Sequence, residues 1–218
     1  MRSLKYITGV EGRRRHGCRL HQPARGHRGR ATDGIGAEVA AADELVALCS
    51  RGFGRPDLLV NNAGIGIPVP RRDLRAGTPE FIERIRRINP PAPWHPIGAA
   101  ESFPDEAEGS VVKVTSVAGT TVSGSSIPYA VSKAALEHLA RCLTVALGPA
   151  VRVDAVAPGH IETDRTRGRT EVRDHVLKHA PAAGRGALAD VADAVLGLVG
   201  SRYTTGAVLP VDGGLGPA

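Results

Sequence analysis

Short apolar runs alternate with segments of helical periodicity along most of this chain, and this alternation restricts the fold more than any other feature. The apolar runs predict strands at 4–8, 57–61, 111–115, 151–157 and 207–211. The helical spacing of apolar residues predicts helices at 38–49, 79–88, 128–147 and 189–199. Apolar strands separated by helices pair in parallel and are buried on both faces. The pattern therefore predicts an α/β fold in one domain spanning residues 1–218.

The segment 10–37 interrupts this alternation, because it is rich in Arg, Gly and His and has no helical or strand period. Residues 1–30 hold nine Lys or Arg and one acid, a net charge of +8 within a chain whose formal charge is +6. Such a segment can be solvated, or it can meet the phosphate of a cofactor or of a nucleic acid. We expect an irregular, solvated segment, rank a cofactor phosphate next, and do not expect nucleic-acid binding.

The three cysteines, Cys18, Cys49 and Cys142, have no metal-like spacing, and their odd number argues against a disulfide framework. No apolar run approaches the roughly 20 residues of a membrane span, and residues 1–10 lack the apolar core of a signal peptide. We therefore expect a cytoplasmic protein without a membrane segment or a metal site.

Tyr129 and Lys133 stand four residues apart in the longest expected helix, so both side chains lie on one helix face. A tyrosine donates a proton to a carbonyl oxygen readily only if its pKa, about 10 when unperturbed, is drawn toward neutrality. A nearby ammonium favours the phenolate and lowers that pKa. The spacing alone thus indicates a general acid and the cation that tunes it.

Several further motifs occur in a fixed order around this pair. They are Asn61-Asn62-Ala63-Gly64, Asn89, Ser116-Val117-Ala118-Gly119, Pro158-Gly159-x-Ile161-x-Thr163 and Val211-Asp212-Gly213-Gly214. Together with Tyr129-x3-Lys133 they resemble the short-chain dehydrogenase/reductase family, most closely its 3-oxoacyl-carrier-protein reductase-like members. The resemblance is clear from about residue 57 to 214 and implies a Rossmann-like doubly wound parallel sheet.

The resemblance implies a catalytic role for four residues in hydride transfer between NAD(P)(H) and a ketone or secondary alcohol. Tyr129 is the general acid in reduction and the base in oxidation, and Lys133 lowers its pKa and binds the nicotinamide ribose. Ser116 donates a hydrogen bond to the substrate oxygen as charge develops there. Asn89 holds a water in a proton relay that reaches Lys133.

The resemblance also implies a set of cofactor-binding residues. They are Thr8, Gly9, Gly12, Glu38, Asn61, Ala63, Gly64, Tyr129, Lys133, Pro158, Gly159, Ile161 and Thr163. Asn61 and Gly64 follow a strand, at the sheet edge where open α/β sheets bind ligands. Ile161 and Thr163 belong to the loop that contacts the nicotinamide carboxamide in the family.

The amino-terminal half departs from the family pattern Thr-Gly-x3-Gly-x-Gly at the first strand-to-helix turn. Thr8, Gly9 and Gly12 are present, but arginines follow in place of the remaining glycine and the helix. Only 52 residues separate Gly9 from Asn61, too few for the expected strand–helix units. We predict that one strand–helix unit is missing or degraded between residues 10 and 37. The arginine cluster at 13–15 mildly favours NADP(H) over NAD(H).

Each site residue also has a purely structural reading. Tyr129 can be a helix-surface tyrosine, Ser116 a turn former and Asn89 only a helix stop before Pro90, while His160 is expected to be exposed. The altered glycine-rich turn keeps a second function open, that of a catalytically impaired relative that binds a ligand or a partner. The resemblance implies a homodimer or homotetramer acting on a small carbonyl or alcohol substrate, and the segment 164–186 carries no readable code for that substrate.

Overall fold

The structure is a computed structural model of the chain. It describes residues 6–8, 18–19, 58–62, 64–89, 109–163, 166, 168–182 and 184–216. The expected helix at 38–49 and the proline-rich stretch at 90–96 lie outside these residues. No helix in the described part of the chain is both long and apolar enough to cross a bilayer.

Six strands form one parallel sheet in the order β2-β1-β3-β4-β5-β6. Their bounds are Tyr6–Thr8 (β1), Cys18–Arg19 (β2), Leu58–Asn61 (β3), Gly109–Val114 (β4), Val151–Pro158 (β5) and Val208–Val211 (β6). The predicted strands at 57–61, 111–115, 151–157 and 207–211 are thus confirmed to within about two residues at each end. The short β2 corrects the expectation that residues 10–37 contain no strand, and its two residues are too few to show a period.

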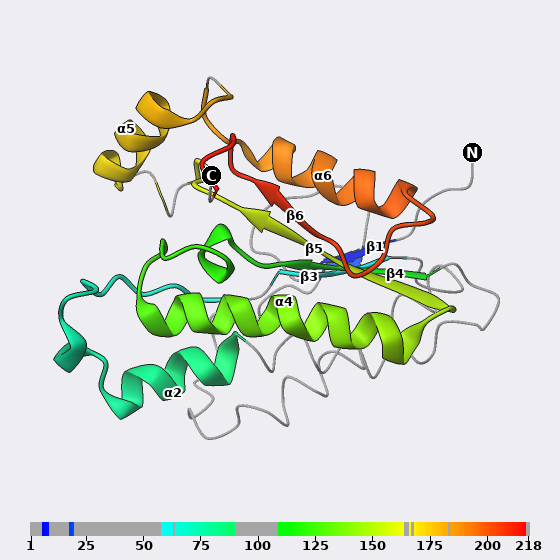
Figure 1. Cartoon of the computed structure of the whole chain (residues 1–218), viewed down its shortest axis with the longest axis horizontal. Helices are drawn as coiled ribbons and strands as arrows, with labels where there is room; N and C mark the ends of the chain where they lie inside the picture. Colours follow the sequence, from blue (N-terminus) through cyan, green and yellow to red (C-terminus); the bar gives the residue numbers. More distant parts are fainter. Residues whose placement is uncertain are drawn as a thin grey trace.

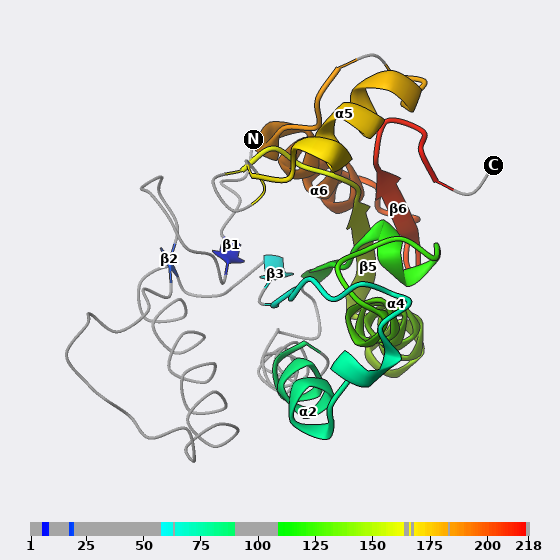
Figure 2. The same ribbon diagram turned by 90° about the vertical axis from the view of Figure 1, so that its left-hand side faces the viewer.

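The described residues form four α-helices, which are Pro79–Ile88 (α2), Ile127–Leu147 (α4), Thr170–His179 (α5) and Leu188–Gly200 (α6). Of these, α4 and α6 pack on opposite faces of this sheet. Figure 1 shows α4 and α2 on one side of the sheet and α6 on the other, and Figure 2 shows the same division along the strands. Helices on both faces of a parallel sheet make a doubly wound α/β fold, as predicted.

In the classic doubly wound order 3-2-1-4-5-6, two strands lie on the outer side of the first strand. Here β1 has β2 on that side, and one further strand would be expected beyond β2. The described residues supply no strand at that position. This agrees with the prediction that one strand–helix unit between residues 10 and 37 is missing or degraded.

The central strands are apolar because a core lies on each side of them. Val111 and Val153 pack beneath α4 with Ala140 and Leu143, while Val112 lies in the opposite core with residues of α6. Alternate side chains of one strand point to opposite faces, so both faces of β4 and β5 are buried. This accounts for continuous apolar runs where a half-exposed strand would alternate with polar residues.

The helix ends follow from local capping chemistry. The hydroxyl of Thr78 accepts the N–H of Phe81 at the start of α2, and that of Ser126 accepts the N–H of Tyr129 at the start of α4. Each helix carries a proline in its first turn, where no intrahelical N–H bond is lost. The predicted helices at 79–88, 128–147 and 189–199 are therefore confirmed to within one residue.

Arg152 of β5 caps the carboxyl end of α6. Its Nη1 donates to the carbonyl oxygens of Leu198, Ser201 and Thr204 at 3.1, 2.9 and 3.2 Å, and its Nη2 donates to that of Val199 at 2.9 Å. Its side chain is only 15% exposed. These carbonyls are the groups that a helix end leaves without partners.

We expect Arg152→Met to destabilise the fold by about 3 kcal/mol, because four carbonyl groups lose a charged donor. A domain of this length loses about 2–4 °C in Tm for each kcal/mol, so thermal unfolding should show a fall of roughly 6–12 °C. Arg84→Met, on the exposed face of α2, is the matched control and should shift Tm by less than about 2 °C. Equal shifts for the two variants would contradict this role of Arg152.

Candidate active site

The loop after β3 brings three of the expected site residues together. A Cβ added to Gly64 would lie 3.4 Å from Oδ1 of Asn89 and 3.5 Å from Nζ of Lys133. Asn61 ends β3 and is only 8% exposed. The neighbouring strand, β4, ends shortly before Ser116. The small residue at position 64 thus leaves the loop backbone directly beside the lysine and the asparagine.

Asn89 is fully buried and connects this loop to α4. Its Oδ1 accepts the N–H of Ile65 at 2.8 Å, while its Nδ2 donates to the carbonyl of Ile65 at 3.0 Å and to Oγ of Ser132 at 2.9 Å. The Ser132 hydroxyl in turn donates to the carbonyl of Tyr129 at 2.7 Å. Asn89 also caps α2, so it is a helix stop and, in addition, the residue that joins α2, the 64–66 loop and α4.

Tyr129 and Lys133 lie on one face of α4, as their spacing predicts. Nζ of Lys133 is 5.7 Å from the centroid of the Tyr129 ring. It donates to the carbonyl oxygen of Val114 at 3.0 Å, and the residue is only 5% exposed. The ammonium is therefore fixed between the end of β4 and the tyrosine ring, while Tyr129 itself is half-buried.

Ser116 follows β4 and begins the short 3-10 helix Val117–Gly119 (η3). Its Oγ accepts the N–H of Ala118 at 3.3 Å and donates to the carbonyl of Pro158 at 3.4 Å. The structural reading of Ser116 as a turn former is thus correct, and its hydroxyl also reaches the loop after β5. Ser116 as a whole is partly exposed at this edge of the sheet.

Two glycines that sequence reasoning missed lie on either side of the Tyr129 ring. A Cβ on Gly66 would approach Cε2 of Tyr129 to 3.3 Å, and a Cβ on Gly124 would approach its Cδ1 to 3.3 Å. Gly124 also has φ +114°, a conformation that other residues rarely adopt. Both glycines let backbone pack closely against the tyrosine, and their presence in loops is the only sequence signal of that role.

The loop after β5 packs against the end of β6. The N–H of Gly159 donates to the carbonyl of Val211 at 3.0 Å, and a Cβ at Gly159 would come within 2.7 Å of Cβ of Asp212. Ile161 is buried and forms a bridge to Gly186, while Thr163 lies in a turn closed by its contact with Thr166 at 3.0 Å. Ser116 and this loop therefore meet at the carboxyl edge of the sheet.

The other expected cofactor-binding positions lie at the amino-terminal end of the chain or in the loop after β3. Thr8 ends β1 and pairs in register with Val60 of β3, so it lies at the same edge of the sheet as Asn61. Gly9, Gly12, Glu38 and Ala63 lie outside the described residues.

Glu137, one turn beyond Lys133, is a buried carboxyl beneath η3. A Cβ on Gly119 would crowd Oε1 of Glu137 and lie 3.0 Å from the backbone carbonyl carbon of Lys133, so the lack of a side chain at this position lets η3 pack closely on α4. Burial raises the pKa of Glu137, while a hydrogen bond with Thr115 and the charges of Arg141 and Lys133 oppose that rise. The carboxyl therefore resists ionisation in the folded chain.

The pKa of Glu137 is higher in the folded chain than the ordinary value of about 4.5 in the unfolded chain. The carboxyl therefore costs no stability below about pH 4.5, and the free energy of unfolding falls as the pH rises from there through the folded pKa. We expect Glu137→Gln to raise Tm by a few degrees at pH 8, because about 2–4 °C corresponds to each kcal/mol. The gain should disappear near pH 4. Thermal unfolding at both pH values tests this, with the exposed Glu171→Gln as control, and a gain that is independent of pH would contradict it.

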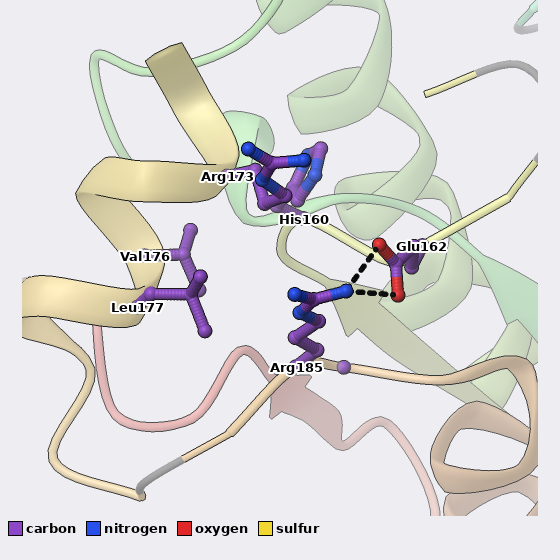
Figure 3. Close-up of a pocket in the computed structure, with 7 residues that line it drawn as sticks. His160, Glu162, Arg173, Val176, Leu177 and Arg185 are labelled. Carbon is purple, nitrogen blue, oxygen red and sulfur yellow. Dashed lines mark hydrogen bonds and ion pairs between the residues drawn. The ribbon is translucent and has the colours of Figure 1, made fainter. Parts of the chain in front are cut away.

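His160 follows Gly159 and is partly buried, which corrects the expectation that it is exposed. It lines a small cleft together with Arg173 and Leu177 of the helix α5 (Thr170–His179) (Figure 3), and this helix was not predicted. Burial lowers the pKa of His160, and the charges of Arg169 and Arg173 lower it further against the opposing effect of Glu162.

Comparison with known proteins gives the same family in sequence and in structure. A family model described as enoyl-(acyl carrier protein) reductase matches residues 34–216. The Streptomyces violaceoruber protein named "Granaticin polyketide synthase putative ketoacyl reductase 2" is 45% identical over 182 residues, which are 82% of this chain and 73% of that protein.

Two solved structures show the same fold. The 3-oxoacyl-[acyl-carrier protein] reductase from Brucella melitensis is 34% identical with a TM-score of 0.70, covering 83% of this chain and 70% of that one. A 7α-hydroxysteroid dehydrogenase complexed with NADH and a 7-oxo bile acid is 30% identical with a TM-score of 0.71, covering 81% of this chain and 70% of that one. The chain therefore belongs to the short-chain dehydrogenase/reductase family of NAD(P)-dependent oxidoreductases.

Proposed function

We propose that the chain reduces a ketone, or oxidises a secondary alcohol, with NAD(P)(H) and with Tyr129 as general acid and base. The observation that carries this proposal is the placement of Nζ of Lys133, 5.7 Å from the centre of the Tyr129 ring and beside the Gly64 loop. When bound, the reduced nicotinamide supplies a hydride to the carbonyl carbon. The tyrosine hydroxyl supplies the proton to the carbonyl oxygen, which completes the alcohol.

Lys133 acts on this proton transfer through its charge. An ammonium close to a phenol stabilises the phenolate that remains after the proton has left. The hydrogen bond from Nζ to Val114 and the burial of Lys133 hold the charge in a low-dielectric position, where it is screened less than at the surface. In alcohol oxidation the same charge prepares Tyr129 to accept a proton.

Ser116 and Asn89 support this step from two sides. The Ser116 hydroxyl is placed between η3 and the loop after β5, and it can exchange its long contact with Pro158 for a hydrogen bond to a substrate oxygen. Asn89 fixes the Gly64 loop against α4 through Ile65 and Ser132. We propose that it holds a water that relays protons toward Lys133, a role that its position beside Gly64 supports.

The described residues fit a nicotinamide cofactor at the carboxyl edge of the sheet. Gly64 lets backbone approach within contact distance of Lys133, and the end of β3 at Asn61 is where doubly wound sheets bind dinucleotides. The loop from Pro158 to Thr163 lies on the other side of Ser116. The NADH named in the hydroxysteroid dehydrogenase complex supports this choice of cofactor.

The names of the relatives support a carbonyl substrate. One is a ketoacyl reductase, another a 3-oxoacyl carrier-protein reductase and a third a hydroxysteroid dehydrogenase. All three names describe oxidation or reduction at a ketone or secondary alcohol carbon. We propose the same bond change for this chain. We also propose that it assembles as a homodimer or homotetramer, which sedimentation at micromolar concentration would measure.

A cofactor titration tests the proposal against the alternative of a catalytically impaired relative. We expect NADPH or NADH to bind with Kd below about 100 μM, or roughly −5.5 kcal/mol, followed by nicotinamide oxidation that depends on an added ketone. NADPH should bind more tightly if the basic amino-terminal residues meet the 2′-phosphate. No detectable binding of either nucleotide at 1 mM, by a chain that unfolds cooperatively, would favour the impaired relative.

A further inference from the structure

Two histidines lie together on the outer face of α5. His175 and His179 are four residues apart, which places one above the other on a helix, and their ring centroids are 4.4 Å apart with 32° between the ring planes. Figure 3 shows Arg173, Val176 and Leu177 turned toward the small cleft beside α5. A helical rotation of about 100° per residue places both histidines on the opposite face of α5. Both are exposed, so the pair is open to solvent.

A contact with the backbone fixes the orientation of one of the two rings. Nδ1 of His179 lies 2.9 Å from the carbonyl oxygen of His175. A carbonyl oxygen can only accept, so Nδ1 carries the proton in this contact and the lone pair of the neutral ring is at Nε2. Histidines that bind metals almost always donate their other ring N–H to a carbonyl, a carboxylate or a water. His179 is thus held as a metal ligand is held.

The carboxyl end of α5 favours a bound cation. The helix ends at His179, and the last carbonyl groups of a helix carry a partial negative charge. Glu171 and Lys178 are exposed on the same helix with opposite charges, and Arg173 and Asp174 pair with each other at 2.9 Å between Nη2 and Oδ1. These four side chains together carry no net charge, so they do not oppose the preference set by the helix end.

The two imidazoles supply only part of a coordination shell. Among the residues that the structure describes, no third His, Cys, Asp or Glu side chain joins the pair in a group that could hold a metal ion. Water therefore fills the remaining positions, unlike in a closed structural zinc site. Imidazole suits Zn²⁺, Cu²⁺ and Ni²⁺, whereas Mg²⁺ and Ca²⁺ prefer oxygen ligands. The chemistry of the pair thus favours a transition-metal ion that exchanges with solvent.

The helix that carries the pair has few other contacts to hold it. α5 has ten residues, its first turn has no side-chain cap, and its buried side chain is that of Val176. A helix of this length is marginal in water without tertiary packing. An ion that bridges His175 and His179 joins two successive turns, so its binding is linked to the folding of the carboxyl-terminal half of α5.

We propose that His175 and His179 form a two-histidine site for Zn²⁺, Ni²⁺ or Cu²⁺ at the carboxyl end of α5. Nε2 of His179 is one ligand, the ring of His175 supplies the second, and water completes the shell. Two histidines four residues apart on one helix face are an arrangement that binds zinc. An occupied site fixes α5, which lines the small cleft with His160 of the loop after β5. The site goes beyond hydride transfer, since metal binding here needs neither nucleotide nor ketone.

Hydrogen exchange measured by mass spectrometry, with and without zinc, tests this site in the full chain. We expect exchange in peptides covering 170–182 to slow about 10-fold when Zn²⁺ is at about 10 times its Kd, because binding suppresses the unwound helix by that factor. Peptides covering α2 should not change. The readout is local to α5, so zinc held elsewhere in the chain does not enter it. Equal exchange of 170–182 with and without 200 μM Zn²⁺ would overturn the proposal.

Variants of the two histidines assign the effect to this pair. His175→Gln and His179→Gln should each abolish the zinc-dependent protection of 170–182. His138→Gln removes an exposed histidine from α4 and should leave the protection as it is in the wild type. Mg²⁺ at the same concentration should protect nothing, since it prefers oxygen ligands. Zinc protection that persists in both α5 variants, or equal protection by Mg²⁺, would contradict a site built from these imidazoles.

Discussion

Replacing Tyr129 by phenylalanine is expected to lower kcat for ketone reduction by about 10²–10⁴-fold, the range typical of a lost general acid. The substitution removes only the hydroxyl, while the ring that packs between Gly66 and Gly124 remains. We therefore expect KM and Tm to change little. The proton for the carbonyl oxygen would then have to come from water, which is a weaker and less well-oriented acid.

The matched control is Tyr203→Phe, because Tyr203 is fully exposed and lies at the opposite end of α6 from the loops that carry the site. It should leave kcat unchanged. Steady-state rates with a reactive diketone and either nucleotide measure both variants. A Tyr129→Phe variant that keeps more than half of the wild-type kcat would rule out Tyr129 as the proton donor.

Replacing Lys113 by methionine is expected to stabilise the fold by several kcal/mol at low pH. Lys113 of β4 is fully buried, and within the described part of the chain its Nζ has no hydrogen-bond partner. It points to the same side of the sheet as Val111, which lies in the core beneath α4. Burial lowers the pKa of Lys113 from 10.5 to about 7.

The sign of the pH dependence follows from that lowered pKa. The unfolded chain holds the proton up to about pH 10.5, while the folded chain releases it above about pH 7, so wild-type stability rises with pH between these values. Below pH 7 the penalty corresponds to about 5 kcal/mol, and at pH 9 to about 2 kcal/mol. Methionine has a similar length and no charge, so it escapes this penalty.

Urea unfolding at pH 6 and pH 9 measures the effect. The free energy of unfolding should rise by several kcal/mol at pH 6 in Lys113→Met and by roughly half of that or less at pH 9. Lys178→Met, exposed on α5, should show neither change. A Lys113→Met variant that is less stable than the wild type at both pH values would show that the ammonium has a stabilising partner.

The amino-acid sequence predicted the helices and strands whose ends or apolar pattern are marked by nearby residues in the chain. The helix around Tyr129 was placed to within one residue because Pro128 and Gly148 mark its two ends. The α5 helix was missed because Arg169 at its start gives no side-chain cap and only Val176 is buried on it. The two-residue strand Cys18–Arg19 was missed because its pairing with β1 is its only defining feature.

In the candidate site, too, the features set by local spacing were predicted and those set by long-range packing were not. The spacing of Tyr129 and Lys133 placed both on one face of a helix, since that geometry is fixed by the helix itself. The contacts of Asn89 with Ile65, and of Gly66 with the Tyr129 ring, join residues far apart in the chain. Such contacts depend on how loops and helices pack, so no local pattern reports them.

Transfer of deuterium from reduced nicotinamide to a ketone tests the central claim most directly. Wild-type protein is incubated with a ketone and with NADPH or NADH that carries deuterium at C4 on the transferred face, and the alcohol is examined by mass spectrometry. The account predicts one deuterium on the carbinol carbon with wild type, and at least 100-fold slower labelling with Tyr129→Phe. Tight nucleotide binding without any labelled alcohol from a panel of ketones would contradict it.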